Sequence, residues 1–163
     1  MADKMTPLQR HHCMSNIHSR GTKPELIVRN WLWRHGYRYR LNVKSLPGSP
    51  DIVLRRYSSV IFINGCFWHG HDCGKFKWPQ TNAEFWRAKI ERNKTRDRRN
   101  YKALHDMGYY VLEVWECQLV QSKRVQTLQA LDRRLSQILL EINHRPIEYC
   151  SSTETGTALA AEP

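Results

Sequence analysis

Hydrophobic positions recur with helical spacing in three segments of the chain. Residues 22–25 (TKPE) have the sequence of a capping box, and the apolar positions after them predict a helix that ends near Gly36. Residues 81–84 (TNAE) have the same form and predict a long helix to about Met107, with Gly108 as its stop. A third helix, predicted for residues 123–143, carries one apolar stripe, made up of Leu128, Leu131, Leu135, Ile138, Leu139 and Ile142.

Four shorter segments have the pattern of β-strands. Residues 37–41 alternate between polar and apolar positions, as a half-exposed strand does. The apolar runs 51–54 and 60–63 are joined by a short polar connection and predict an antiparallel hairpin at the centre of a sheet. Residues 109–115 predict a further, buried strand. Together with the helices, these strands indicate an α/β fold in which a mixed central sheet is flanked by helices.

The two ends of the chain differ in composition from the rest. Residues 1–21 lack a clean period and are rich in Arg and His, which predicts a flexible basic arm that lies along DNA phosphates. Residues 151–163 are rich in Ser, Thr and Ala and predict a disordered tail, which leaves residues 22–150 as a single domain. Because there is neither a membrane-length apolar run nor a signal peptide, we expect a soluble cytoplasmic protein.

The chain is strongly basic. Its 26 Lys and Arg exceed its 15 Asp and Glu, which gives a formal net charge of +11. More than half of this charge lies in the predicted long helix, where eight basic residues between Arg87 and Lys102 are opposed only by Glu91 and Asp97. Because neutralisation of phosphates and release of their counterions drive nucleic-acid binding, this charge predicts a nucleic acid as the partner.

A cluster of cysteine and histidine residues predicts a metal site. Three cysteines and one histidine are a common tetrahedral zinc complement, and Cys66, His71, Cys73 and Cys117 supply one, although their local spacing is not a common zinc-finger pattern. His69 or Asp72 is an alternative to His71, and a group of buried free thiols is the alternative to a metal. Four protein ligands leave no open position, so we expect this metal to be structural. Cys13 and Cys150 remain as spare thiols.

A second candidate site combines a carboxylate with the end of a strand. Asp51 follows Pro50 at the head of one predicted strand, and the neighbouring strand ends at Ile63 and Asn64. An Asp carboxylate beside a backbone carbonyl offers the oxygen ligands that Mg²⁺ prefers, although most Pro-Asp pairs are turns. His69 and Glu25 are candidates for acid–base chemistry, with a spare loop histidine and a helix cap as the respective alternatives.

Aromatic residues lie next to positive charge at two places, Phe67-Trp68 in the cysteine-rich segment and Phe85-Trp86 at the head of the basic helix. Apolar side chains on such protrusions can wedge between base steps and kink a duplex. The alternative is a small aromatic core around the metal.

Several motifs in a fixed order resemble the very-short-patch repair endonucleases, the Vsr family. They are residues 64–69 (NGCFWH) with His71 and Cys73, then 84–86 (EFW), 96–99 (RDRR) and 114–117 (VWEC), and the resemblance runs from about Ser15 to Leu119. That family has a restriction-endonuclease-like fold and nicks duplex DNA on the 5′ side of the thymine of a T:G mismatch, where 5-methylcytosine has been deaminated. The resemblance therefore implies DNA with a T:G mismatch as substrate, Mg²⁺ as catalytic cofactor and Zn²⁺ as structural metal.

The resemblance also implies a role for each matching residue. Asp51 and the main-chain carbonyl of Ile63 correspond to the Mg²⁺ ligands, His69 to a water-activating or phosphate-contacting histidine, and Glu25 to a supporting acid. The structural zinc ligands correspond to Cys66, His71, Cys73 and Cys117. The DNA contacts correspond to the wedge residues Phe67, Trp68 and Trp86, together with Asn64, Lys89, Asn93 and Arg96. One departure is that Ile63-Asn64 stands where a version of the motif has Thr-His, so a histidine role at position 64 is lost.

Three functions are compatible with these residues. The first is a mismatch-specific nicking endonuclease, a monomer in the bacterial cytoplasm associated with the nucleoid, with other DNA repair proteins as further candidate partners. The second is a non-catalytic, zinc-stabilised DNA-binding module. The third is a restriction-type nuclease that cuts intact duplex.

Overall fold

Four strands and three long helices make up the part of the chain that the structure describes. This part, taken from a computed structural model, comprises residues 6, 8–9, 12, 20–74 and 76–144. The elements in order are α2 (Lys23–Arg34), β1 (Arg40–Leu41), β2 (Ile52–Leu54), β3 (Ser59–Asn64), α3 (Ala83–Asp106), β4 (Tyr110–Trp115) and α4 (Arg124–Asn143). The predicted arm at residues 1–21 lies largely, and the predicted tail at residues 151–163 wholly, outside the described residues.

The strands form one mixed sheet in the order β1-β2-β3-β4. β1 and β3 both run antiparallel to β2, and β4 runs parallel to β3. The hairpin predicted from the two apolar runs is therefore present as β2 and β3, at the centre of the sheet. The parallel pair needs a crossover, which α3 provides.

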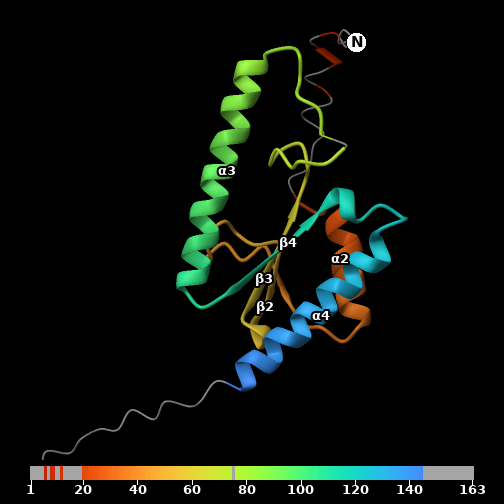
Figure 1. The fold of residues 1–163 in the computed structure, drawn as a ribbon, viewed down its shortest axis with the longest axis vertical. Coiled ribbons are helices and arrows are strands. Elements are labelled where there is room, and N and C mark those ends of the chain that lie inside the picture. Colours follow the sequence, from red (N-terminus) through yellow and green to blue (C-terminus); the bar gives the residue numbers. More distant parts are fainter. Residues whose placement is uncertain (1–5, 7, 10–11, 13–19, 75, 145–163) are drawn as a thin grey trace, which may run out of the picture.

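Helices cover both faces of the sheet, as Figure 1 shows, with α2 and α4 on one side and α3 on the other. Alternate strand residues serve the two faces, because side chains along a strand point in opposite directions. Ile52, Leu54 and Ile61 pack with residues of α2 and α4, whereas Val53 and Val60 pack with Leu104 of α3. This double coverage explains why the central strands are continuously apolar, and it confirms the predicted mixed sheet flanked by helices.

The ends of α2 are those that the sequence predicts. Thr22 is the N-cap and Glu25 completes the capping box, while Gly36, just beyond the C-cap, has a left-handed backbone (φ 83°). On the inner face of α2, Val28 and Leu32 are fully buried. The predicted capping box therefore places Glu25 at the very start of α2.

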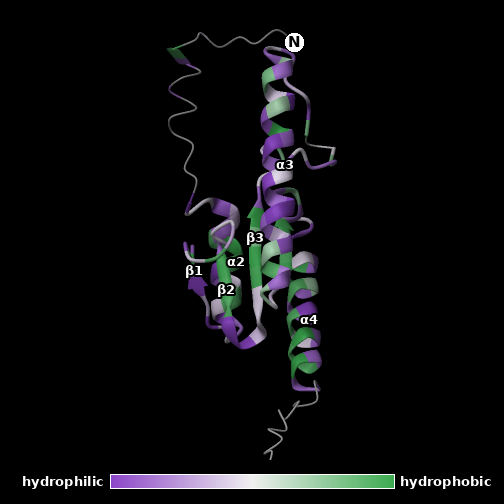
Figure 2. Ribbon diagram, turned by 90° about the vertical axis from the view of Figure 1, so that its left-hand side faces the viewer, coloured by the Kyte–Doolittle hydropathy of each residue, from purple (hydrophilic) through white to green (hydrophobic). Residues whose placement is uncertain are grey.

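The long helix α3 begins one residue later than a cap at Thr81 would require. Asn82 is the N-cap, with a left-handed backbone (φ 53°) and no side-chain capping bond, so the capping box predicted at residues 81–84 is wrong. Figure 2 shows α3 projecting past the sheet with mainly hydrophilic residues, in contrast to hydrophobic β2 and β3. Of its 24 residues only Ile90, Asn93 and Leu104 are buried. None of the helices within the described ranges is long and apolar enough to cross a membrane.

Two strand predictions need correction. Only Arg40 and Leu41 of the segment 37–41 form a strand, and both are exposed; Tyr37 is instead buried, with its hydroxyl donating to Asp132 on α4 at 2.6 Å. β4 is not a buried strand, because it lies at the edge of the sheet and only Val114 is buried. In both segments the position within the sheet, rather than the hydrophobic pattern, decides the exposure.

Candidate active site and metal centre

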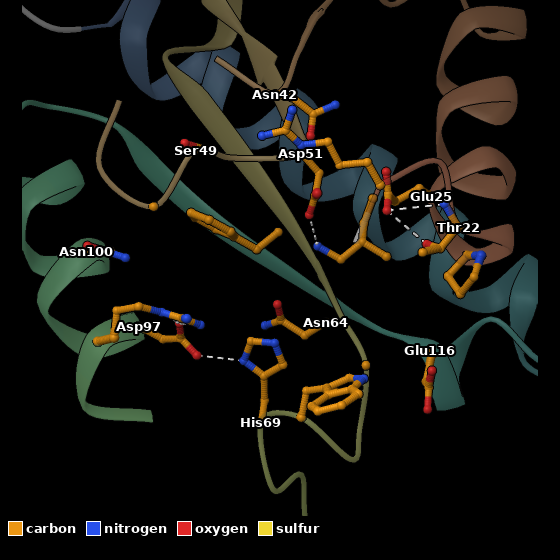
Figure 3. A pocket seen from close by; sticks show the side chains of 18 of the residues that line it. Thr22, Glu25, Asn42, Ser49, Asp51, Asn64, His69, Asp97, Asn100 and Glu116 are labelled. Atoms are coloured by element: carbon orange, nitrogen blue, oxygen red, sulfur yellow. Dashed lines mark hydrogen bonds and ion pairs between the residues drawn. The ribbon is translucent and has the colours of Figure 1, made fainter. Parts of the chain in front are cut away.

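A cavity of about 850 Å³ opens beside the carboxyl end of β3. Its walls come from the start of α2, the segment before β2, the end of β3, the loop after it and the middle of α3 (Figure 3). Among the predicted site residues, those that line it are Glu25, Asp51, Ile63, Asn64, Trp68, His69 and Arg96. Residues from five separate segments therefore meet in one place.

Asp51 faces the end of β3, where its carboxylate accepts a hydrogen bond from the N–H of Ile63 at 2.8 Å. In an antiparallel pair the N–H and carbonyl of one residue point to the same side, so the Ile63 carbonyl also faces β2. Ile61 of β3 pairs with Ile52 of β2, and the same register, continued by two residues, places Ile63 opposite Pro50. Proline has no N–H to donate to the Ile63 carbonyl.

The charge of Asp51 is only partly compensated by its surroundings. Burial raises the pKa of this carboxyl above its usual range, and the Glu25 carboxylate adds to the rise, although the Ile63 N–H opposes it. A partly buried carboxylate next to a backbone carbonyl is an oxygen donor set for a hard cation. The residues therefore fit a Mg²⁺ ion at this position.

Glu25 is a buried carboxylate whose oxygens are already engaged. It accepts hydrogen bonds from the N–H of Gly21 at 3.0 Å and from the hydroxyl of Thr22 at 2.9 Å, and it pairs with the guanidinium of Arg29. The capping role is therefore present in the structure. Because Glu25 also lines the cavity with Asp51, its charge acts on the same site.

His69 and Asp97 form a hydrogen-bonded pair on the opposite wall. The Nδ1 atom of His69 lies 2.6 Å from Oδ2 of Asp97, and Arg96 donates to the other oxygen of the same carboxylate at 3.0 Å. Burial alone would raise the pKa of Asp97, but the bonds to His69 and Arg96 outweigh it and lower the pKa. A carboxylate on Nδ1 selects the tautomer that leaves Nε2 as a proton acceptor.

The four predicted metal ligands converge although Cys117 is 44 residues from Cys73. One ligand atom from each of Cys66, His71, Cys73 and Cys117 lies within 4.8 Å of the others. Nδ1 of His71 is 3.5 Å from the sulfurs of both Cys66 and Cys117. Burial raises the pKa of the Cys66 thiol to about 12, so a cation in the cluster is what would make this sulfur a thiolate ligand. Asp72 is exposed and His69 faces the cavity, so neither replaces His71.

The loop that carries these residues is anchored to α3. Gly70 has a left-handed backbone (φ 56°), and a Cβ there would lie 2.7 Å from a side-chain carbon of Ile90. Asn93, buried in α3, donates its side-chain N–H to the carbonyl of Trp68 at 2.8 Å. This hydrogen bond ties the loop to α3. A direct contact between Asn93 and DNA stays a prediction.

The wedge residues form one aromatic group at the head of α3. The ring centroid of Phe67 lies 5.2 Å from that of Trp68 and 5.0 Å from that of Trp86, both in edge-on contact. Phe85 and Trp78 are about half exposed beside them. The small aromatic core that the sequence allows is therefore present, and its outer rings face solvent next to the basic residues of α3. Among those basic residues, Lys89 and Arg96 are exposed.

Asn64 is held within the protein. Its side-chain N–H donates at 3.1 Å to the hydroxyl of Tyr101 and at 3.1 Å to Glu113, and the residue is buried. Burial raises the pKa of Tyr101, so this hydroxyl stays neutral. These bonds leave the side-chain oxygen of Asn64 as the atom available for a contact with DNA, which stays a prediction.

Comparison with known proteins finds relatives that cover most of the chain. A type II nicking enzyme of Neisseria meningitidis serogroup A is 48% identical over 119 residues, covering 73% of this chain and 85% of that protein. A type II nicking enzyme of Xanthomonas oryzae is 42% identical and covers 85% of this chain and 98% of its own length. The DNA mismatch endonuclease Vsr of Escherichia coli K12 is 42% identical over 84% of this chain and 87% of its own. The family model described as DNA mismatch endonuclease Vsr matches residues 2–75.

The chain belongs to the Vsr family of DNA mismatch endonucleases. The resemblance drawn from the motifs is thus confirmed. Within this Vsr protein, sequence reasoning missed the role of Asp97 in the site: it counted Asp97 as a charge on the basic helix and as a member of the motif at residues 96–99, without a role of its own. Its spacing from Arg96 and Arg98 carries no signal of a partner 28 residues earlier, which only the folded chain brings to it.

Proposed function

We propose that this protein nicks duplex DNA on the 5′ side of the thymine of a T:G mismatch, by Mg²⁺-dependent hydrolysis of a phosphodiester. The observation that carries the proposal is the meeting, in one cavity, of the Asp51 carboxylate with the His69–Asp97 pair. Membership of the Vsr family, whose relatives are named as nicking enzymes and a mismatch endonuclease, supports it.

Each residue of the cavity has a role in this proposal. Asp51 and the Ile63 carbonyl hold the Mg²⁺, which when bound polarises the scissile phosphate. His69 accepts a proton from the attacking water at Nε2, and Asp97 holds its ring through Nδ1. Glu25, held by Thr22 and Arg29, contributes negative charge behind Asp51.

Mismatch recognition is assigned to the aromatic group and to α3. Phe67, Trp68 and Trp86 wedge into the stack, which costs less at a mismatch because its bases unstack more readily. The remaining DNA contacts are assigned to Lys89, Arg96, Asn64 and Asn93. The basic residues of α3 supply the phosphate contacts that hold the duplex meanwhile.

The metal of the cysteine cluster is proposed to be Zn²⁺ in a structural role. Three sulfurs and one imidazole nitrogen are a typical zinc complement, and the four fill its tetrahedral shell. The cluster links the loop after β3 to the turn after β4. It thereby holds the loop on which Phe67, Trp68 and His69 lie.

Asp51→Ala tests the catalytic proposal directly. Wild-type protein and the variant are incubated with end-labelled T:G and T:A duplexes and Mg²⁺, and nicking and binding are measured separately. The variant should bind the T:G duplex as tightly as the wild type but not nick it. Asp106→Ala, an exposed position at the end of α3, is the matched control and should nick normally.

The same assay separates the alternatives. Tight binding by the wild type without strand cleavage would show a non-catalytic DNA-binding module. Equal cutting of T:G and T:A duplexes would show a nuclease without mismatch specificity. Normal nicking by Asp51→Ala would refute the assignment of the catalytic carboxylate.

A further inference from the structure

The indole of Trp115 contacts both a residue of the metal cluster and His69. Its ring stacks on the imidazole of His71, with centroids 4.0 Å apart and planes only 5° from parallel. His69 makes an edge contact with the same indole, with centroids 6.2 Å apart and an interplanar angle of 77°. One indole therefore contacts both a metal-ligand candidate and the proton-acceptor candidate.

The indole is held by the sheet and not by the loop. Trp115 is the last residue of β4, where it pairs with Asn64 of β3. Its backbone N–H donates to the side-chain oxygen of Gln118 at 3.0 Å, which ties the end of the strand to the following turn. Cys117, a member of the metal cluster, lies in that same turn. The ring is thus a rigid reference surface for the loop that carries His69 and His71.

The two contacts of His69 constrain different motions. Asp97 fixes the position of the Nδ1 atom through a hydrogen bond, but a single bond restricts the tilt of the imidazole plane less. The nearly perpendicular contact with the indole restricts this tilt and so sets the direction of Nε2. The stack on His71 places a metal-ligand candidate against the same indole, so the two imidazoles share one reference surface.

We propose that Trp115 is a positioning residue that couples the metal centre to His69. This inference rests on the proposed function, since it assigns Trp115 an effect on the proton acceptor of that reaction. Loss of the indole disturbs both ends of the contact: the orientation of His71 at the metal, and the aim of His69 at the attacking water. Outer residues that orient metal ligands typically change metal affinity or activity by about 10- to 100-fold when removed.

The test compares Trp115→Leu with Trp115→Phe, which keeps a flat ring, and with Trp33→Leu, which removes an exposed tryptophan of α2. Two properties are measured on the full-length protein. The first is the metal centre itself, from the visible absorption of the Co²⁺-loaded protein and the rate of metal release to a chromogenic chelator. The second is the single-turnover nicking rate at saturating T:G duplex, with the duplex Kd determined separately.

For Trp115→Leu we expect an altered Co²⁺ spectrum, faster metal release and a nicking rate about 10- to 100-fold lower at unchanged Kd. Trp115→Phe should recover most of the rate, and Trp33→Leu should match the wild type. Wild-type nicking by Trp115→Leu, or a loss in Trp115→Phe as large as in Trp115→Leu, would overturn the proposal. An unchanged metal centre in an impaired Trp115→Leu would equally overturn the coupling.

If Trp115→Leu does not fold, a second variant tests the same proposal. His71→Cys offers four sulfurs to the metal and removes the stacked ring; it should keep its metal and nick more slowly. A His71→Cys protein that keeps its metal and nicks at the wild-type rate would refute the role of the stack. Failure of the proposed function is distinguishable, because then the wild type does not nick, while the Co²⁺ spectrum and metal release still show whether Trp115 supports the metal centre.

Discussion

Replacing Asp97 by Asn removes the charge that holds His69 while keeping the size of the side chain. In the wild type the carboxylate lies 2.6 Å from Nδ1 of His69, and both side chains are less than one-fifth exposed. An amide in this place offers a neutral oxygen to Nδ1, or, if it rotates, an N–H that selects the wrong tautomer. We therefore expect slower nicking with intact DNA binding.

The size of the effect follows from the strength of the bond that is lost. A hydrogen bond to a charged group contributes about 1.5–3 kcal/mol. At about 1.36 kcal/mol per tenfold in rate, this corresponds to a nicking rate roughly 10- to 160-fold lower. The partial exposure of the pair favours the lower half of that range, because solvent screens its charges.

The assay is single-turnover nicking of a T:G duplex, with the Kd measured in parallel. Asp106→Asn on the same helix is the matched control, because this exposed residue pairs with Lys102, does not line the cavity and should have no effect. Asp97→Asn is also combined with His69→Ala. If Asp97 acts through His69, the double variant nicks no more slowly than His69→Ala alone. Multiplicative losses in the double variant, or a rate within twofold of wild type for Asp97→Asn, would refute the reasoning.

Three further predictions concern the metal centre, the carboxylate and the basic helix. Cys117→Ser should lose the bound metal and melt at a lower temperature. Cys150→Ser should keep its metal and the wild-type melting temperature, as measured by metal analysis and calorimetry. Asp51→Asn should raise the melting temperature of Mg²⁺-free protein at pH 7, because burial penalises the ionised form. That gain should shrink as the pH falls through the raised pKa of Asp51 and both proteins become neutral there; a gain that persists at pH 3 would contradict it. Arg92→Gln with Arg99→Gln should reduce the slope of log Kd against log salt by about 1.8, and an unchanged slope would show that neither residue contacts a phosphate.

Much of the fold is readable from local patterns because its causes are local. The capping box at Thr22 and Glu25 lies at the start of the helix that it predicts, and the apolar stripe lies within the helix α4 that it predicts. The apolar runs of β2 and β3 reflect coverage on both faces, which continuous hydrophobicity signals directly. The start of α3 was mispredicted because Thr81 and Glu84 have the right spacing, but the left-handed backbone of Asn82 breaks the cap.

The sequence by itself determined the family, the residue types of both sites and the basic helix, because motif order and charge are properties of the chain. It also provided a candidate ligand set at the cysteine cluster, with His69 or Asp72 left as alternatives to His71. Only the tertiary structure decided between these histidine and aspartate candidates and which groups act on one another: that Asp97 holds His69, that Asn64 is turned to Tyr101 and Glu113, and that Trp115 contacts two imidazoles. The physical reason is that these contacts join residues of, or next to, β3, α3 and β4. The crossover between the parallel strands β3 and β4 brings together side chains that are far apart in the sequence, and no periodic pattern of residues reports such a contact.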